Sequence, residues 1–81
     1  MISAAQLKAA RALLGIDQRQ LAEASGLSLP TIQRMEASES TVRGNVDSLV
    51  KLTEALAALG IELIGAGAPS PSGGRGVRLK T

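Results

Sequence analysis

Apolar residues recur at helical spacing through the first 60 positions of the chain. In "SAAQLKAARALLG" the residues that share one face are Leu7, Ala10, Arg11 and Leu14. Ser3 is followed three residues later by Gln6, a spacing typical of the capping box that begins a helix, and Gly15 is placed to end it. The pattern therefore predicts a first helix between Ser3 and Gly15.

Two shorter helices are predicted next, on either side of a glycine turn. Asp17 can cap the first of them, which ends before Gly26, and Ser28 can cap the second, over roughly residues 29 to 37. Pro30 fits the first turn of that helix, because a missing N–H costs nothing there. Residues 38–45 then read as a polar turn.

The longest helix is predicted over "VDSLVKLTEALAALG". On a helical wheel its main core stripe consists of Val46, Leu49, Val50, Thr53, Leu56 and Ala57, and Leu52, Ala55 and Leu59 extend the stripe along one side. The apolar arc covers about 180° of the helix, given 3.6 residues per turn. It indicates either a well-buried central helix or a helix with a flank that packs on a second subunit.

The chain changes character after residue 60. "IELI" at 61–64 and "GVRLK" at 76–80 alternate as short strands, with the Gly/Pro/Ser-rich "GAGAPSPSGGR" between them. The alternation predicts a small hairpin, formed within one subunit or exchanged between two, that lies against the long helix or a partner. The alternative is a disordered tail from about residue 66. We thus expect an all-α domain over residues 1–60 and a strand-loop-strand element over residues 61–81.

Composition narrows the class of function. The 81 residues include no Cys, His, Trp, Tyr or Phe, and the net charge is +2. Because the thiolate and imidazole ligands of transition metals and the usual general base are missing, we expect no metal, no cofactor and no enzymatic activity. No apolar run approaches the ~20 residues of a membrane span, and the N-terminus lacks a signal-peptide pattern. We therefore expect a cytoplasmic binding protein that does not enter a membrane.

A tight turn at "SGLS" joins the second and third predicted helices. Ala22 is small where the two helices would cross closely, and Gly26 permits the left-handed turn conformation. Leu27 and Ile32 would bury the turn and the back of the following helix. This spacing is typical of a helix-turn-helix, whose second helix enters the major groove of DNA.

The segment "ARALLGIDQRQLAEASGLSLPTIQRMEAS" resembles the lambda-repressor/Cro-like helix-turn-helix family, also called the xenobiotic-response-element family. The matching residues are Arg11, Gly15, Gln18, Leu21, Ala22, Gly26, Ile32 and Glu36. With "NVDSLVKLTEALAALGIEL" included, the likeness covers roughly residues 3–63 and leaves out the strand-like tail. It implies a four-helix lambda-repressor-like domain, here followed by a small C-terminal β-hairpin.

The resemblance also implies which residues contact DNA. Base contacts would come from Leu29, Pro30, Gln33 and Arg34, and a phosphate contact from Gln18 at the start of the second helix. Leu29 and Pro30 offer apolar contact only, whereas Gln33 suits adenine and Arg34 suits guanine. Further candidates for phosphate contact are Arg19, Thr31, Arg43 and Asn45. The alternative for these polar residues is an ordinary solvated face.

Arg11 and Glu36 lie on faces that are predicted to be buried. In the family the matching residues form an ion pair that joins the first and third helices, so the resemblance implies a structural pair and not a catalytic acid.

We therefore expect a sequence-specific transcriptional regulator of double-stranded DNA, a repressor that acts as a homodimer on a pseudo-palindromic operator. The predicted dimer interface consists of Leu52, Ala55, Leu59, Ile61 and Leu63. The alternative is an antitoxin-like protein whose C-terminal segment binds a toxin by adding a strand to its sheet, with DNA binding serving to regulate its own operon.

Overall fold

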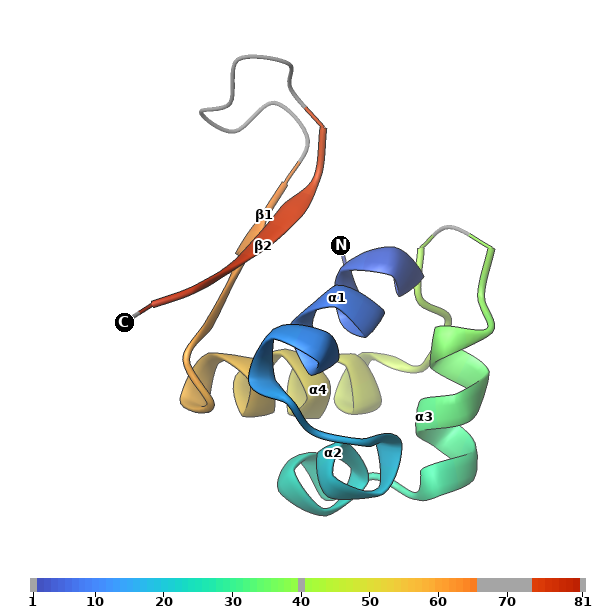
Figure 1. The fold of residues 1–81 in the computed structure, drawn as a ribbon. Coiled ribbons are helices and arrows are strands. Elements are labelled where there is room, and N and C mark those ends of the chain that lie inside the picture. Colours follow the sequence, from blue (N-terminus) through green and yellow to red (C-terminus); the bar gives the residue numbers. More distant parts are fainter. Residues whose placement is uncertain (1, 40, 66–73, 81) are drawn as a thin grey trace.

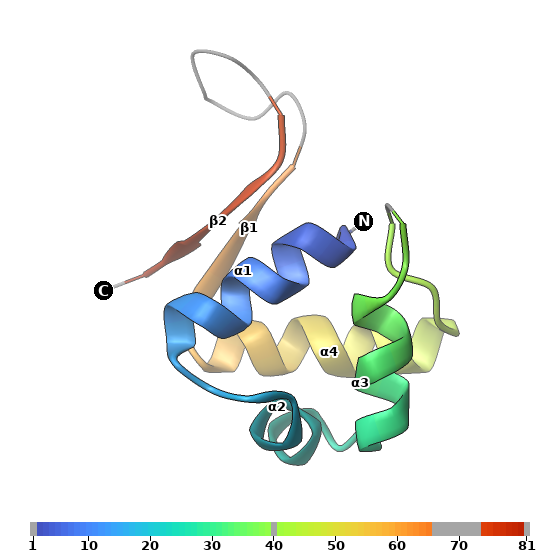
Figure 2. The same cartoon turned by 45° about the vertical axis from the view of Figure 1, so that its right-hand side comes forward.

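Four helices and a two-stranded hairpin make up the fold in the computed structural model, which describes residues 2–39, 41–65 and 74–80. The elements are α1 (Ala4–Leu14), α2 (Gln18–Ser25), α3 (Leu29–Glu36), α4 (Val46–Ala58), β1 (Ile61–Ile64) and β2 (Gly76–Leu79). Both views place α1 and α2 on opposite sides of α4, with α3 toward the N-terminal end of α4 (Figures 1 and 2). The predicted four-helix fold with a hairpin is confirmed.

Side-chain caps begin all four described helices, and the sequence predicts those at Ser3, Asp17 and Ser28. Ser3, Asp17, Ser28 and Asn45 each accept a hydrogen bond from the backbone N–H three residues on. At α1 and α2 the cap is a reciprocal capping box, in which Gln6 and Gln20 bond back to the cap residue. Local hydrogen bonding therefore sets the helix starts.

The core is aliphatic and draws on all four helices. The largest fully buried side chains are Leu7, Leu21, Ile32, Met35, Leu52 and Leu56. Because no aromatic ring is present, many small aliphatic contacts take the place of a few large ones.

The predicted core stripe of α4 is wrong in part. Leu56 is fully buried, but Val46 is 75% exposed, Val50 is 45% exposed and Ala57 is also exposed. The buried residues of the helix are Leu52, Ala55 and Leu56. Among the described residues, the other elements therefore cover only one side of the apolar arc, and the two fully buried leucines, Leu52 and Leu56, lie on that side.

The loop between α3 and α4 contributes a core residue that the polar-turn interpretation missed. Val42 is only 2% exposed, and its N–H donates to the carbonyl of Ile2 over 3.0 Å. Ser3 and Thr41 form an isolated antiparallel bridge beside it. The start of the chain is thus tied to the loop that follows α3.

The two predicted strands pair as an antiparallel hairpin. Ile61 lies opposite Leu79 and Leu63 opposite Val77, and these four side chains pack toward the helical core. On the other face Glu62 and Arg78 form an ion pair. The strands run beside α1 (Figure 1), and β1 also contacts α4. The alternative of a disordered tail from about residue 66 is wrong for residues 76–79, which form β2, and residues 66–73 lie outside the described residues.

One side chain joins the hairpin to the first helix. The Gln6 Nε2 donates to the carbonyl of Ile64 over 3.0 Å and to the carbonyl of Gly76 over 2.8 Å. Its Oε1 accepts from the N–H of Ser3 over 2.9 Å. Gln6 therefore both caps α1 and holds one end of the strand ladder, where Ile64 lies opposite Gly76.

Candidate nucleic-acid interface

The turn between α2 and α3 fixes the direction of the second helix. Gly26 has a φ of 73°, a left-handed conformation that costs a residue with a Cβ roughly 1–2 kcal/mol. A Cβ at Gly26 would meet nothing within 4 Å, so conformation and not space calls for glycine. The N–H of Leu27 then donates to the carbonyl of Ala22 over 3.1 Å and closes the end of α2.

α3 divides cleanly into a buried and an outward face. Ile32, Met35 and Glu36 are buried, whereas Pro30, Gln33 and Arg34 are exposed and Leu29 and Thr31 are half-buried. All four predicted base-contacting residues, Leu29, Pro30, Gln33 and Arg34, therefore keep side-chain surface outside the core. The helix presents two long polar side chains on a firmly packed base.

A short chain of hydroxyl contacts supports Arg34. The Ser28 hydroxyl lies 2.8 Å from the Thr31 hydroxyl, and Arg34 Nη2 donates to Thr31 Oγ1 over 3.4 Å. Thr31, predicted to contact a phosphate or a base, thus also has a partner within α3. Its contact draws the guanidinium along the outward face of the helix.

The predicted phosphate-contacting residues outside α3 lie in two different settings. Arg19 in α2 and Arg43 in the loop before α4 are exposed. Asn45 is also exposed, but its Oδ1 accepts from the N–H of Ser48 over 2.8 Å to cap α4. Gln18 is half-buried, and its Nε2 donates to Glu36 Oε1 over 3.0 Å, an intramolecular contact that the sequence did not reveal.

The implied Arg11–Glu36 ion pair is present and is bidentate. Arg11 Nε lies 2.7 Å from Glu36 Oε2, and Arg11 Nη2 lies 2.9 Å from Glu36 Oε1. Burial alone would raise the pKa of the Glu36 carboxyl, but the hydrogen bonds from Arg11 and Gln18 outweigh it and lower that pKa from its ordinary value. Together these three side chains join α1, α2 and the C-terminal end of α3.

A family model described as helix-turn-helix, of the lambda-repressor/Cro-like class, matches residues 7–63. The chain belongs to this helix-turn-helix family. No curated protein and no solved structure matched it. The helix-turn-helix domain is a DNA-binding regulatory domain and not a catalytic one, and the protein is a DNA-binding transcriptional regulator.

Two features are absent from the described part of this helix-turn-helix protein. None of its helices has the length and apolar character needed to cross a membrane. Nor do His, Cys, Asp and Glu side chains gather there in a group that could hold a metal ion.

The dimer interface predicted for the helix-turn-helix protein needs correction. Leu52, Ala55 and Ile61 are 0%, 8% and 3% exposed in a single subunit, so they belong to the core and cannot offer a surface to a second copy. Leu63 is half-buried, and Leu59 is 40% exposed. For Leu52 and Ala55 the error follows from the rotation of α4, since these two residues lie on the side of the helix that faces the core.

Proposed function

We propose that the protein is a repressor that binds a pseudo-palindromic operator as a homodimer, with α3 in the major groove. The observation that carries the proposal is the outward face of α3, where Gln33 and Arg34 are exposed on a helix whose other face is buried. Arg34 would read guanine through its O6 and N7 atoms, and Gln33 would read adenine through N6 and N7. Leu29 and Pro30 would supply apolar contact, for example to a thymine methyl group.

Positioning on the duplex would come from contacts to phosphates, which orient a protein without reading sequence. Arg19 lies in the first turn of α2 and Arg43 in the loop that follows α3, and both are exposed. Gln18 and Asn45 already bond within the subunit, so they would act through the polar atoms that these bonds leave available.

Two copies are needed because a helix of eight residues reads too few base pairs for useful specificity. Two recognition helices on adjacent half-sites lie about 34–36 Å apart, one turn of DNA. A dimer that covers a promoter excludes RNA polymerase, so repression is the expected direction of regulation.

The antitoxin-like alternative would use the hairpin to bind a partner's sheet. The hairpin packs on α1 and α4 of its own subunit and is held there by Gln6. No described feature of the hairpin indicates what kind of partner it would bind. The function that we propose is therefore transcriptional regulation through DNA binding.

Selection of bound duplexes from a random DNA pool tests the proposal. Wild type should enrich an inverted repeat with a guanine in each half-site, and Arg34→Ala should lose that guanine preference, at about 1–3 kcal/mol of discrimination per contact. Arg75→Ala, which removes an exposed arginine outside the helix-turn-helix, is the matched control and should select the same repeat. Failure to enrich any sequence, with binding that only weakens as salt rises, would reduce the interaction to phosphate attraction and refute specific reading by α3.

A further inference from the structure

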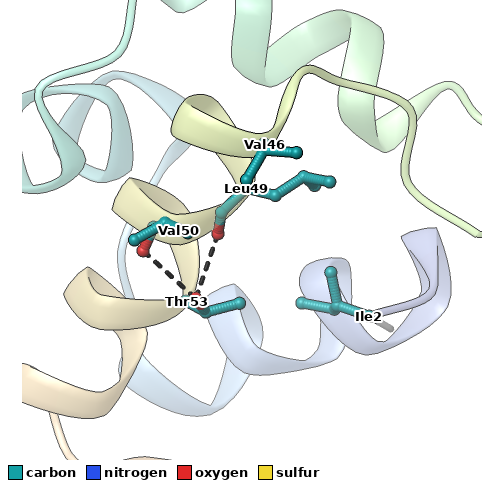
Figure 3. A pocket seen from close by; sticks show the side chains of 5 residues that line it. All are labelled: Ile2, Val46, Leu49, Val50 and Thr53. Atoms are coloured by element: carbon teal, nitrogen blue, oxygen red, sulfur yellow. Dashed lines mark hydrogen bonds between the residues drawn. The ribbon is translucent and has the colours of Figure 1, made fainter.

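The N-terminal half of α4 carries an apolar groove that the helix-turn-helix does not account for. It is lined by Ile2, Val46, Leu49, Val50 and Thr53, with a volume of about 290 Å³. Figure 3 shows four of these side chains in a row along α4, with Ile2 beside them from the start of the chain. Val46 and Val50 are among the few large apolar side chains of the described residues that remain exposed.

The residues of α4 that line the groove form an apolar stripe, and the one hydroxyl in it, that of Thr53, is bonded to the helix backbone. Thr53 Oγ1 donates to the carbonyl of Leu49 over 3.0 Å and lies 3.1 Å from the carbonyl of Val50, as the dashed lines in Figure 3 show. With its hydroxyl bonded to the helix backbone, Thr53 adds a methyl group to the apolar surface. The spacing of Val46, Val50 and Thr53 is the i, i+4, i+7 pattern of a seam between helices.

We propose that a second copy of this chain occupies the groove, with the two α4 helices antiparallel about a two-fold axis near Leu49. This inference rests on the proposed dimeric function and names the surface that forms the dimer. An isologous contact must be self-complementary, so one surface has to supply both a protruding side chain and the groove that receives it. The stripe has both. Val46 protrudes at one end of the groove and has the most exposed large apolar side chain of the described residues, and Val50 and Thr53 line the groove one to two turns further along the same helix.

Charges beside the stripe select the register. Asp47 and Lys51 are exposed, have opposite charge and lie one turn apart on the same flank. In an antiparallel pair centred on residue 49, Asp47 of each copy faces Lys51 of the other. The same register sets Glu54 opposite residue 44 of the second copy, next to Arg43. Among the described residues, none of these four charged groups makes an ion pair within its own subunit.

The same register also fits the apolar contacts. Residue 46 of one copy lies at the level of residue 52 of the other. Val46 of the first copy therefore lies between the levels of Val50 and Thr53 of the second copy, which line its groove. A parallel pair would instead set the charged flank of one helix against the core-facing side of the other. Charge and shape therefore both favour the antiparallel arrangement.

The location of the stripe connects the contact to DNA reading. It lies on the half of α4 nearer to α3 in both views (Figures 1 and 2). A contact there would set the distance and angle between the two recognition helices.

A charge-exchange series on the full chain tests the inference by sedimentation velocity. Asp47→Lys and Lys51→Asp should each raise the dimer Kd about tenfold or more, because each sets like charges opposite one another in two symmetry-related places. The double exchange should return the Kd to near the wild-type value. Val50→Gln should weaken the dimer, whereas Leu13→Gln, at a side chain that is 46% exposed on α1, should leave the Kd unchanged. Far-ultraviolet circular dichroism of each variant checks that the helices are intact.

Binding to DNA separates this inference from the proposed function. Val50→Gln should keep the affinity of wild type for a single half-site and lose affinity for the inverted repeat. The α4 interface would be overturned if neither single exchange changed the dimer Kd, or if the double exchange failed to restore the wild-type Kd. Specific binding to a half-site would still support the proposed function as a regulator. A wild-type chain that stays monomeric both alone and on the inverted repeat would also overturn the α4 interface.

Discussion

Replacing Arg11 by Met should destabilise the fold more than removing its partner does. The Glu36 side chain is 5% exposed, whereas that of Arg11 is 25% exposed. Arg11→Met takes two short hydrogen bonds from a buried carboxylate and leaves it only the bond from Gln18. Leaving one charge of a buried pair without its partner costs about 3–5 kcal/mol, and we expect about 3 kcal/mol here because Gln18 remains.

Glu36→Gln, which removes the other partner of the pair, should lower the free energy of unfolding by a smaller amount. Glu36→Gln leaves Arg11 with a contact to the carbonyl of Ile16 and with access to water, so we expect a loss of about 1–2 kcal/mol. The double variant Arg11→Met/Glu36→Leu should recover most of the stability, since a buried pair replaced by apolar residues of similar size is often neutral or stabilising.

The cost of Arg11→Met should also depend on pH. In the wild type the pKa of Glu36 is lowered in the folded state, so the pair stabilises the fold above the ordinary pKa of 4.5 and loses that contribution as pH falls through the lower folded value. In Arg11→Met the hydrogen bonds from Arg11 that lower the pKa of Glu36 are gone, so burial should raise that pKa. Protonation of Glu36 in acid then removes a buried unpaired charge from the variant, whereas it breaks the ion pair of the wild type. The difference in unfolding free energy between wild type and Arg11→Met should therefore become smaller in acid.

Urea unfolding followed by far-ultraviolet circular dichroism measures these differences, because the chain has no Trp, Tyr or Phe for fluorescence. Protein concentration should be held constant, since association changes the apparent stability. Equal costs for Arg11→Met and Glu36→Gln, together with a difference that does not change between neutral and acid pH, would refute the view of Glu36 as a buried charge.

Three further predictions concern local structure. Gly26→Ala should lower the unfolding free energy by about 1–2 kcal/mol through its left-handed φ alone, with Gly26→Asn less costly, in thermal melts. Ser28→Ala should cost about 1 kcal/mol by removing the cap of α3, and a variant as stable as wild type would show that the cap contributes nothing. Gln6→Leu should speed amide hydrogen exchange in β1 and β2 but not in α2 or α3, and unchanged exchange in the strands would contradict the role of Gln6 in holding the hairpin.

The features predicted correctly from the sequence are those that neighbouring residues decide. Ser3, Asp17 and Ser28 bond to N–H groups three residues away, so their effect is visible in a short window. The two strands were likewise visible as alternation. The rotation of α4 was not, because an arc that is apolar over half the helix leaves the choice of buried side to elements elsewhere in the chain. Val42 was missed because it is a single apolar residue in a polar loop.

The site shows the same division. The outward face of α3 follows from its own periodicity around Ile32 and Met35, and the family resemblance pointed to Arg11 and Glu36. The bond from Gln18 to Glu36 spans 18 residues and depends on how α2 meets α3. Local spacing contains no signal for such a contact, although a polar residue at the start of α2 that faces a buried carboxylate is a natural place to search for one.

The hairpin has a consequence for the order of events during synthesis. Its two strands and the amide of Gln6 meet across 58 and 70 residues of chain, whereas the helix caps close over three. On a growing chain, made at about 5–20 residues per second, the four helices are complete before β2 exists. Contacts between nearby segments form faster than distant ones, so the recognition helix should be in place before the hairpin docks. A chain that ends after residue 65 should therefore still display the proposed DNA-reading surface of α3.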